Sequence, residues 1–144
     1  LPNGSGLSRQ ARLSPEAMVR ALRAIREDFV VGPELIAALP LLGVDGTLTA
    51  FRRSAARGQV RAKTGTLAGA TCLSGYVMVQ GRGLYFSFMG ARIRHLYRLR
   101  RRHVAMIEAL RRYLKTLGGR AAPRLDTPSR SDPRDPHSLQ TGRR

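Results

Sequence analysis

Residues 61–69 read RAKTGTLAG, and the interpretation of this stretch decides the fold of the chain. A phosphate-binding loop would need Gly-x-x-x-x-Gly-Lys-Thr, because its second glycine lets backbone N–H groups close around the phosphates. Ala62 occupies that glycine's place, and another strand-like segment follows instead of a helix. The stretch therefore reads either as a strand edge that presents Lys63, Thr64 and Gly65 to a ligand, or as an ordinary turn at the end of a strand.

The residues around this stretch predict a small antiparallel sheet. A short strand is expected at 60–62. Segments 71–80 (TCLSGYVMVQ) and 84–93 (LYFSFMGARI) are rich in β-branched and aromatic residues. Because Gly81, Arg82 and Gly83 separate them, they predict a β-hairpin.

The N-terminal half predicts two helices. Ser14-Pro15-Glu16 supplies an N-cap, a proline in the first helical position and an acid in the first turn, and apolar residues follow at helical spacing. These features predict a helix over about 15–28. A second, short helix is expected at 33–39, closed by Pro40.

The C-terminal half predicts one long helix and a tail. From Leu96, apolar residues recur every three or four positions to residue 117, and Gly118-Gly119 is expected to end the helix. Segment 118–144 is rich in Pro, Ser, Arg and Asp. Because such a segment buries too little apolar surface to offset its ordering entropy, we expect a domain over 1–117 and a disordered basic tail over 118–144.

The chain is strongly basic, with 26 Lys and Arg against 9 Asp and Glu and a net charge of +17. This balance favours anionic partners such as nucleic acid, acidic lipid or cell-wall polymer. Segment 92–103 (RIRHLYRLRRRH) could lie along a phosphate backbone. No nucleic-acid-binding module is present and aromatic residues are not interleaved for base stacking, so a basic nucleic-acid-binding protein is the alternative function and specific nucleic-acid binding is not expected. No apolar run approaches the ~20 residues of a membrane span, and no signal peptide is visible.

Three segments stand in order along the chain: NGSGLSR at 3–9, LPLLGVDGTL at 39–48 and AKTGTLAGATCLSGY at 62–76. Together they resemble the penicillin-binding D-alanyl-D-alanine carboxypeptidase/endopeptidase family of the class C, low-molecular-mass type. The resemblance covers about residues 2–90 and extends more loosely to 117. It implies the C-terminal part of a mixed α/β (α+β) fold, the penicillin-recognising fold of serine transpeptidases and β-lactamases, in which an antiparallel sheet is covered by helices.

The resemblance also implies an activity and a site. The family consists of serine-type hydrolases that cleave D-Ala-D-Ala stem peptides of peptidoglycan outside the cytoplasmic membrane, bind β-lactams and use no metal or other cofactor. Lys63 would supply positive charge and take part in proton transfer, and the Thr64 hydroxyl would bind the substrate carboxylate. Gly65 would leave room for the substrate beside the strand, and the Thr66 amide would donate to the oxyanion.

The family's other two catalytic motifs are absent from these 144 residues. A Ser-x-x-Lys would supply the nucleophile and a Ser-x-Asn would complete the proton path. Val60 and Arg112 stand three positions before the two lysines, and the one asparagine, Asn3, has Leu1 two positions before it. We therefore expect one wall of the active site in this chain, with no activity from the chain alone.

Other reactive side chains are expected to be structural. Cys72 is the single cysteine and is interpreted as a small buried thiol on a strand. Asp45 is interpreted as a turn former, because Asp-Gly is typical of turns. A triad of Ser5 with His95 or His103 is conceivable, but both histidines lie in a basic stretch that we expect to be solvated or packed.

Overall fold

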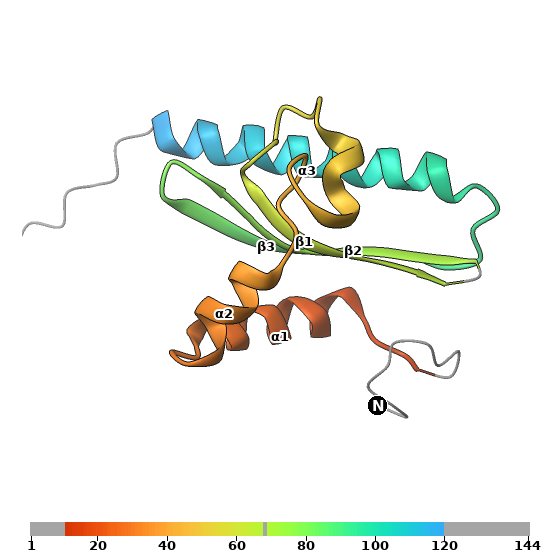
Figure 1. The fold of residues 1–144 in the computed structure, drawn as a ribbon, viewed down its shortest axis with the longest axis horizontal. Coiled ribbons are helices and arrows are strands. Elements are labelled where there is room, and N and C mark those ends of the chain that lie inside the picture. The colour runs from red at the N-terminus through yellow and green to blue at the C-terminus, as the bar shows by residue number, and fades with distance from the viewer. Residues whose placement is uncertain (1–10, 68, 120–144) are drawn as a thin grey trace, which may run out of the picture.

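The computed structural model describes residues 11–67 and 69–119, which form a three-stranded sheet with helices on both faces (Figure 1). Helix α3 runs along one face, and α1 and α2 lie on the opposite face. The mixed α+β architecture with a helix-covered antiparallel sheet is thus confirmed. The elements in chain order are α1 (Pro15–Glu27), α2 (Val31–Ala38), the 3-10 helix η1 (Gly46–Phe51), β1 (Val60–Leu67), β2 (Ala70–Val79), β3 (Arg82–Gly90) and α3 (Leu96–Gly119).

The predicted hairpin is present, with its turn displaced toward the N-terminus. Strands β2 and β3 are antiparallel and pair from Thr71↔Gly90 to Val79↔Arg82. The turn is made by Gln80 and Gly81, which both have positive φ (52° and 75°). Two consecutive positive φ values are typical of the tight turns whose twist matches that of the flanking strands. Of the three residues expected between the strands, Gly81 lies in the turn, whereas Arg82 and Gly83 belong to β3, so that part of the expectation was wrong.

Strand β1 is longer than the three residues predicted and contains the whole Lys-Thr-Gly motif. It pairs antiparallel with β2 from Val60↔Val77 to Leu67↔Ala70. The motif lacks apolar alternation, but the backbone pairing with β2 does not depend on side-chain type, and strand propensity is easily overridden by such pairing. The interpretation of the motif as an ordinary turn is thus excluded.

The main core lies between α3 and the sheet. Ile107 and Leu114 of α3 are almost completely buried there. Helix η1 and the turn before it close one side of this core, since Leu42 and Leu48 have no exposed surface. The remaining core residues come mostly from the strands: Ala56, Val60, Ala62, Leu73, Val77, Val79 and Phe86. Burial of this apolar surface fixes η1 and α3 against the same face of the sheet.

The opposite face is joined to α1 through two tyrosines. The buried Tyr76 hydroxyl donates to the Leu22 carbonyl of α1 at 2.8 Å. The Tyr76 and Tyr85 rings pack edge to face, with centroids 5.5 Å apart. Arg26 lies over the Tyr85 ring at 5.9 Å. A polar and aromatic contact therefore connects α1 to the middle of the sheet.

The helix bounds differ from the expectations at four ends, including the end of α2, which lies at Ala38 rather than residue 39. Helix α1 begins as predicted, with Ser14 Oγ accepting from the Ala17 amide, but ends one residue earlier. Helix α2 begins at Val31 rather than residue 33, because Asp28 Oδ1 accepts from the amides of Val30 and Val31 at 2.9 and 2.8 Å. These bonds lower the pKa of Asp28.

Helix α3 includes Gly118 and Gly119, so its predicted end at 117 was wrong. A glycine near the end of an already formed helix costs only about 1 kcal/mol relative to alanine, which does not stop propagation. The rest of the predicted tail, 120–144, and the NGSGLSR segment lie outside the described residues. In the described part of the chain, no helix is long and apolar enough to span a membrane.

Candidate active site

The side chains of the Lys-Thr-Gly-Thr stretch alternate between the two faces of the sheet, because successive residues of a strand point in opposite directions. Thr64 and Thr66 share a face with the buried Val60 and Ala62, beneath α3 and η1. Lys63 and Gly65 belong to the face that carries α1 and α2. The structure thus places the four predicted site residues together on one strand but divides their side chains between two faces.

The backbone of β1 also alternates, between β2 on one side and the outer edge on the other. At the outer edge, Val60 O accepts from the Leu42 amide at 2.9 Å and the Ala62 amide donates to Pro40 O at 3.0 Å. By this alternation the N–H and C=O groups of Thr64 and Thr66 also point to the outer edge. Within residues 11–67 and 69–119, no backbone-to-backbone bond is made at this edge beyond Ala62. The Thr66 amide, the predicted oxyanion donor, therefore lies on an open strand edge.

The Lys63 ammonium lies at the same edge. Its side chain is exposed, and Nζ donates to the carbonyl oxygen of Thr64 at 2.7 Å. Because that carbonyl points outward from β1, the bond brings a positive charge beside the open backbone. A bound carboxylate or a developing oxyanion at this edge would be attracted by that charge.

The two threonine hydroxyls are held by residues from other elements. Thr64 Oγ1 lies 2.9 Å from Thr47 Oγ1 on η1. Thr66 Oγ1 accepts from an Arg100 guanidinium nitrogen on α3 at 2.7 Å. The buried Leu48 anchors η1 in the core and so places Thr47 beside Thr64. The hydroxyls are therefore positioned by the packing of η1 and α3 on the sheet.

A cavity of about 280 Å³ opens beside Thr64 and Arg100. We call it the threonine cavity. It is lined by Thr47, Ala50, Phe51, Thr64, Thr71, Cys72, Leu73, Arg100 and His103. Hydroxyl and guanidinium donors around a small cavity are suited to an oxyanion such as a carboxylate.

Sequence reasoning missed Arg100 as a site residue. In the sequence it is only one member of the arginine-rich stretch 92–103. The structure distinguishes it from its neighbours, because it lines the threonine cavity and its side chain donates to Thr66. Helical spacing placed it on α3, but no local pattern pointed to a partner on β1.

His103 is buried, with 3% of its surface exposed, and its ring packs on Phe88 with centroids 5.7 Å apart. Burial lowers the pKa of His103 from its ordinary value. His95 is exposed, so the expectation that these histidines are packed or solvated is confirmed. Ser5 lies outside the described residues. Asp45 accepts from the Leu41 amide at 2.7 Å, as expected for a turn former.

Gly65 is opposite Cys72 on β2, and a Cβ atom on Gly65 would lie 2.5 Å from the Cys72 sulfur. The glycine therefore has a packing role within the sheet that the motif did not reveal. Cys72 is on a strand as predicted, but it is half-buried rather than buried. Its cross-strand neighbours Gly65 and Met89 are half-buried too, because the helices leave this end of the sheet partly uncovered.

The fold has counterparts among solved structures. The chain is similar to penicillin binding protein 4 (dacB) from Haemophilus influenzae, in a crystal structure of its complex with a β-lactam, with 28% identity and a TM-score of 0.59. That match covers 78% of this chain and 28% of the other. A second structure of the same protein matches with 25% identity and a TM-score of 0.58, covering 81% of this chain and 27% of the other. The chain thus spans little more than a quarter of the length of these proteins.

Of the sequence comparisons, the one with protein families agrees with this likeness. No curated protein sequence gives a significant match. The model of the D-Ala-D-Ala carboxypeptidase 3 (S13) family matches residues 1–112, which include α1, α2, η1, the whole sheet and most of α3. The expected penicillin-recognising fold is therefore confirmed, and the chain belongs to the D-Ala-D-Ala carboxypeptidase 3 (S13) family.

Proposed function

We propose that this chain forms one wall of the active site of a serine-type D-Ala-D-Ala carboxypeptidase that acts on peptidoglycan stem peptides in the periplasm or cell envelope. The observation that carries the proposal is the open edge of β1. Outward backbone N–H groups and the Lys63 ammonium lie at this edge, and two threonine hydroxyls with the Arg100 guanidinium lie on the adjoining face. Membership of the S13 family supports it. The β-lactam bound by the Haemophilus influenzae protein supports β-lactams as further ligands.

Each residue has a role that follows from its place on the strand. The Thr66 amide points out of the edge and donates to the oxyanion that forms at the scissile carbonyl. The Thr64 hydroxyl, at the mouth of the threonine cavity, binds the terminal carboxylate of the substrate. Lys63 supplies electrostatic attraction and takes part in proton transfer at the same edge. Gly65 leaves the strand narrow enough for a peptide to lie beside it.

The nucleophile is not among these 144 residues, since they contain no Ser-x-x-Lys and no Ser-x-Asn. A fluorescent penicillin should therefore leave the chain unlabelled, because no activated serine is present to be acylated. Stoichiometric covalent labelling that disappears on replacement of a serine would overturn this part of the proposal. No cofactor is required, because a serine nucleophile and an oxyanion hole suffice for acyl transfer.

Substrate binding can be tested without turnover. Backbone amide signals of residues 63–66 should shift in nuclear magnetic resonance titrations with a short acylated peptide that ends in D-Ala-D-Ala. The shifts should weaken with a peptide that ends in L-Ala-L-Ala or carries a C-terminal amide, because the carboxylate contact is then misplaced or lost. Equal shifts with all three peptides would contradict the proposal.

A matched pair of variants assigns the contact to Thr64. Thr64→Val removes the hydroxyl and should weaken binding of the D-Ala-D-Ala peptide about tenfold, the usual loss for a charge-assisted hydrogen bond. Thr49→Val is the control, since Thr49 lies on η1, its hydroxyl donates to Gly46 O and it does not line the threonine cavity. Similar losses in both variants would place the binding elsewhere.

A further inference from the structure

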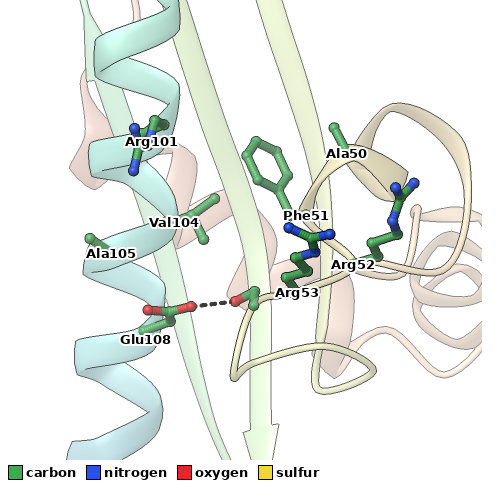
Figure 2. A pocket seen from close by; sticks show the side chains of 9 residues that line it. Ala50, Phe51, Arg52, Arg53, Arg101, Val104, Ala105 and Glu108 are labelled. Atoms are coloured by element: carbon green, nitrogen blue, oxygen red, sulfur yellow. Dashed lines mark hydrogen bonds between the residues drawn. The ribbon is translucent and has the colours of Figure 1, made fainter.

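A second cavity, of about 570 Å³, lies between α3 and the segment that includes the end of η1 (Figure 2). Its volume is within the range of small-molecule and cofactor sites. We call it the arginine pocket. Arg52, Arg53 and Arg101 supply its charged groups, and Phe51 and Val104 supply its main apolar surface. Figure 2 shows Arg101 on the helix at one side and Arg52 and Arg53 on the facing segment.

The positive charge of this pocket is only partly neutralised within the described residues. All three arginines are exposed, and within residues 11–67 and 69–119 none of them makes a salt bridge. Glu108 is the one carboxylate among the lining residues. Its Oε1 already accepts from Ser54 Oγ at 2.6 Å and from the Ala55 amide at 3.2 Å. The pocket therefore presents three guanidinium groups, each able to bind an oxyanion through two parallel hydrogen bonds.

The same carboxylate fixes the shape of the pocket. Hydrogen bonds to Glu108 attach residues 54 and 55 to α3, and the bond from Ser54 is the dashed line in Figure 2. Arg52 and Arg53 directly precede this tether, and Arg101 lies two turns before Glu108 on α3. The arginines are thus attached to two elements whose separation is set by a hydrogen bond, which reduces the ordering cost of binding a ligand between them.

The arginine pocket adjoins the threonine cavity. Ala50 and Phe51 line both cavities. Of two successive residues of α3, Arg100 lines the threonine cavity and Arg101 lines the arginine pocket. Helix α3 runs opposite to β1, because Arg100 contacts Thr66 whereas Arg111 contacts Gln59, which precedes the strand. The pocket lined by Arg101 and Glu108 is therefore displaced from Thr66 in the direction of Thr64 and the start of β1.

We propose that the arginine pocket binds a carboxylate carried by the leaving group of an acidic peptide substrate. This inference rests on the proposed function. With the scissile carbonyl at the Thr66 amide and the terminal carboxylate of the leaving residue at Thr64, a long side chain on that residue that extends past Thr64 enters the arginine pocket. A single D-alanine ends at the threonine cavity, whereas a larger leaving residue with an acidic side chain reaches the three guanidinium groups.

Two matched peptides test this assignment on the 144-residue chain. Both are N-acetyl-D-Ala-D-Lys with a free C-terminal carboxylate, one carrying a succinyl group and the other a butyryl group on the lysine side chain. Nuclear magnetic resonance titrations follow the arginine side-chain N–H signals and the amides of Thr64 and Thr66. The succinyl peptide should bind about tenfold more tightly at low salt and should shift the Arg52, Arg53 and Arg101 signals.

Variants separate the pocket from general basicity. Arg101→Gln, or Arg52→Gln combined with Arg53→Gln, should abolish the preference for the succinyl peptide. Arg112→Gln removes an exposed arginine of the same helix that does not line the pocket and should leave the preference intact. Equal affinity for the two peptides, or an equal loss in Arg112→Gln, would overturn the proposal.

The readouts also separate this inference from the proposed function. Shifts at Thr64 and Thr66 with both peptides, at equal affinity and without a shift of the three arginine signals, would sustain the carboxypeptidase site and reject the arginine pocket as a subsite. Shifts confined to the arginines, with none at Thr64 and Thr66, would reject the shared binding path and with it the inference. Inorganic phosphate that shifts the same arginines at lower concentration than the succinyl peptide would overturn the assignment to a carboxylate.

Discussion

Gly65 and Cys72 face each other across β1 and β2 so closely that a Cβ on the glycine would lie 2.5 Å from the cysteine sulfur. Real Cβ atoms do not approach other atoms this closely, so an added methyl group must displace the thiol or the strand. We therefore expect Gly65→Ala to lower the free energy of unfolding by about 1–3 kcal/mol, a typical cost of overpacking. Urea denaturation followed by circular dichroism measures this change.

A double-mutant cycle identifies the cause. In the Cys72→Ala background, the thiol is absent and Gly65→Ala should cost less than about 1 kcal/mol. A cost that is unchanged in that background would show that the close approach to Cys72 is not what excludes a side chain at Gly65.

Tyr76 connects the sheet to α1, and its hydroxyl is the group that makes the contact. Tyr76→Phe removes the bond to the Leu22 carbonyl while keeping the ring, so we expect a loss of about 1 kcal/mol in the free energy of unfolding. Tyr113→Phe is the control, because Tyr113 is 54% exposed, and it should change stability by less than about 0.5 kcal/mol. Equal effects in the two variants would contradict a specific role for the buried hydroxyl.

Burial also raises the pKa of Tyr76 above its ordinary value of 10.0. In an alkaline titration monitored by tyrosine absorbance, we expect one tyrosine to ionise at higher pH than the rest. That late component should be missing from Tyr76→Phe and present in Tyr113→Phe.

His103 makes the stability of the chain depend on pH. Burial lowers the pKa of this residue in the folded state below 6.5, so the unfolded chain takes up its proton first as the pH falls. The contribution of the neutral imidazole to stability is complete above pH 6.5 and is lost as the pH falls through the folded pKa. The free energy of unfolding should therefore decrease between pH 7.5 and 5.5.

Two histidine variants check this dependence. His103→Gln removes the titrating group and should flatten the change in unfolding free energy over that interval. His95→Gln removes an exposed histidine and should leave it as in the parent chain. A steep dependence that persists in His103→Gln would assign the effect to other groups.

Glu108 stabilises the contact between α3 and residues 54 and 55. Glu108→Ala removes the acceptor of two hydrogen bonds and should lower the free energy of unfolding by about 1–3 kcal/mol. Glu34→Ala, at an exposed position on α2, should cost less than about 1 kcal/mol. Amide hydrogen exchange at Ala55 should accelerate in the first variant only.

The parts of the fold that sequence reasoning predicted well are those with a strong local signal. The capped start of α1 and the apolar period of α3 placed both helices to within two residues at each end. The β-branched and aromatic residues of β2 and β3 predicted the hairpin. Each of these signals is contained within about 25 consecutive residues, so it can be recognised in the sequence without knowledge of the tertiary structure.

The features that were missed depend on contacts between distant segments. The second half of β1 is a strand because β2 pairs with it, although Lys63 and Gly65 are poor strand formers. The early start of α2 depends on an Asp28 side chain that caps it from outside the predicted range. Arg100 joins the candidate site only because α3 crosses the sheet above Thr66.

The alternation of β1 has a consequence for how the chain can vary in length. Thr64 and Thr66 direct both side chains to the face beneath α3 and both amides to the open edge because they are two residues apart, in phase with Ala62. Insertion or deletion of one residue between Ala62 and Thr66 would exchange the two faces and turn the Thr66 amide, the proposed oxyanion donor, toward β2. The spacing of the four-residue motif thus matters as much as its side chains. The same four residues would occupy the same faces and edges only if the alternation of the strand is preserved.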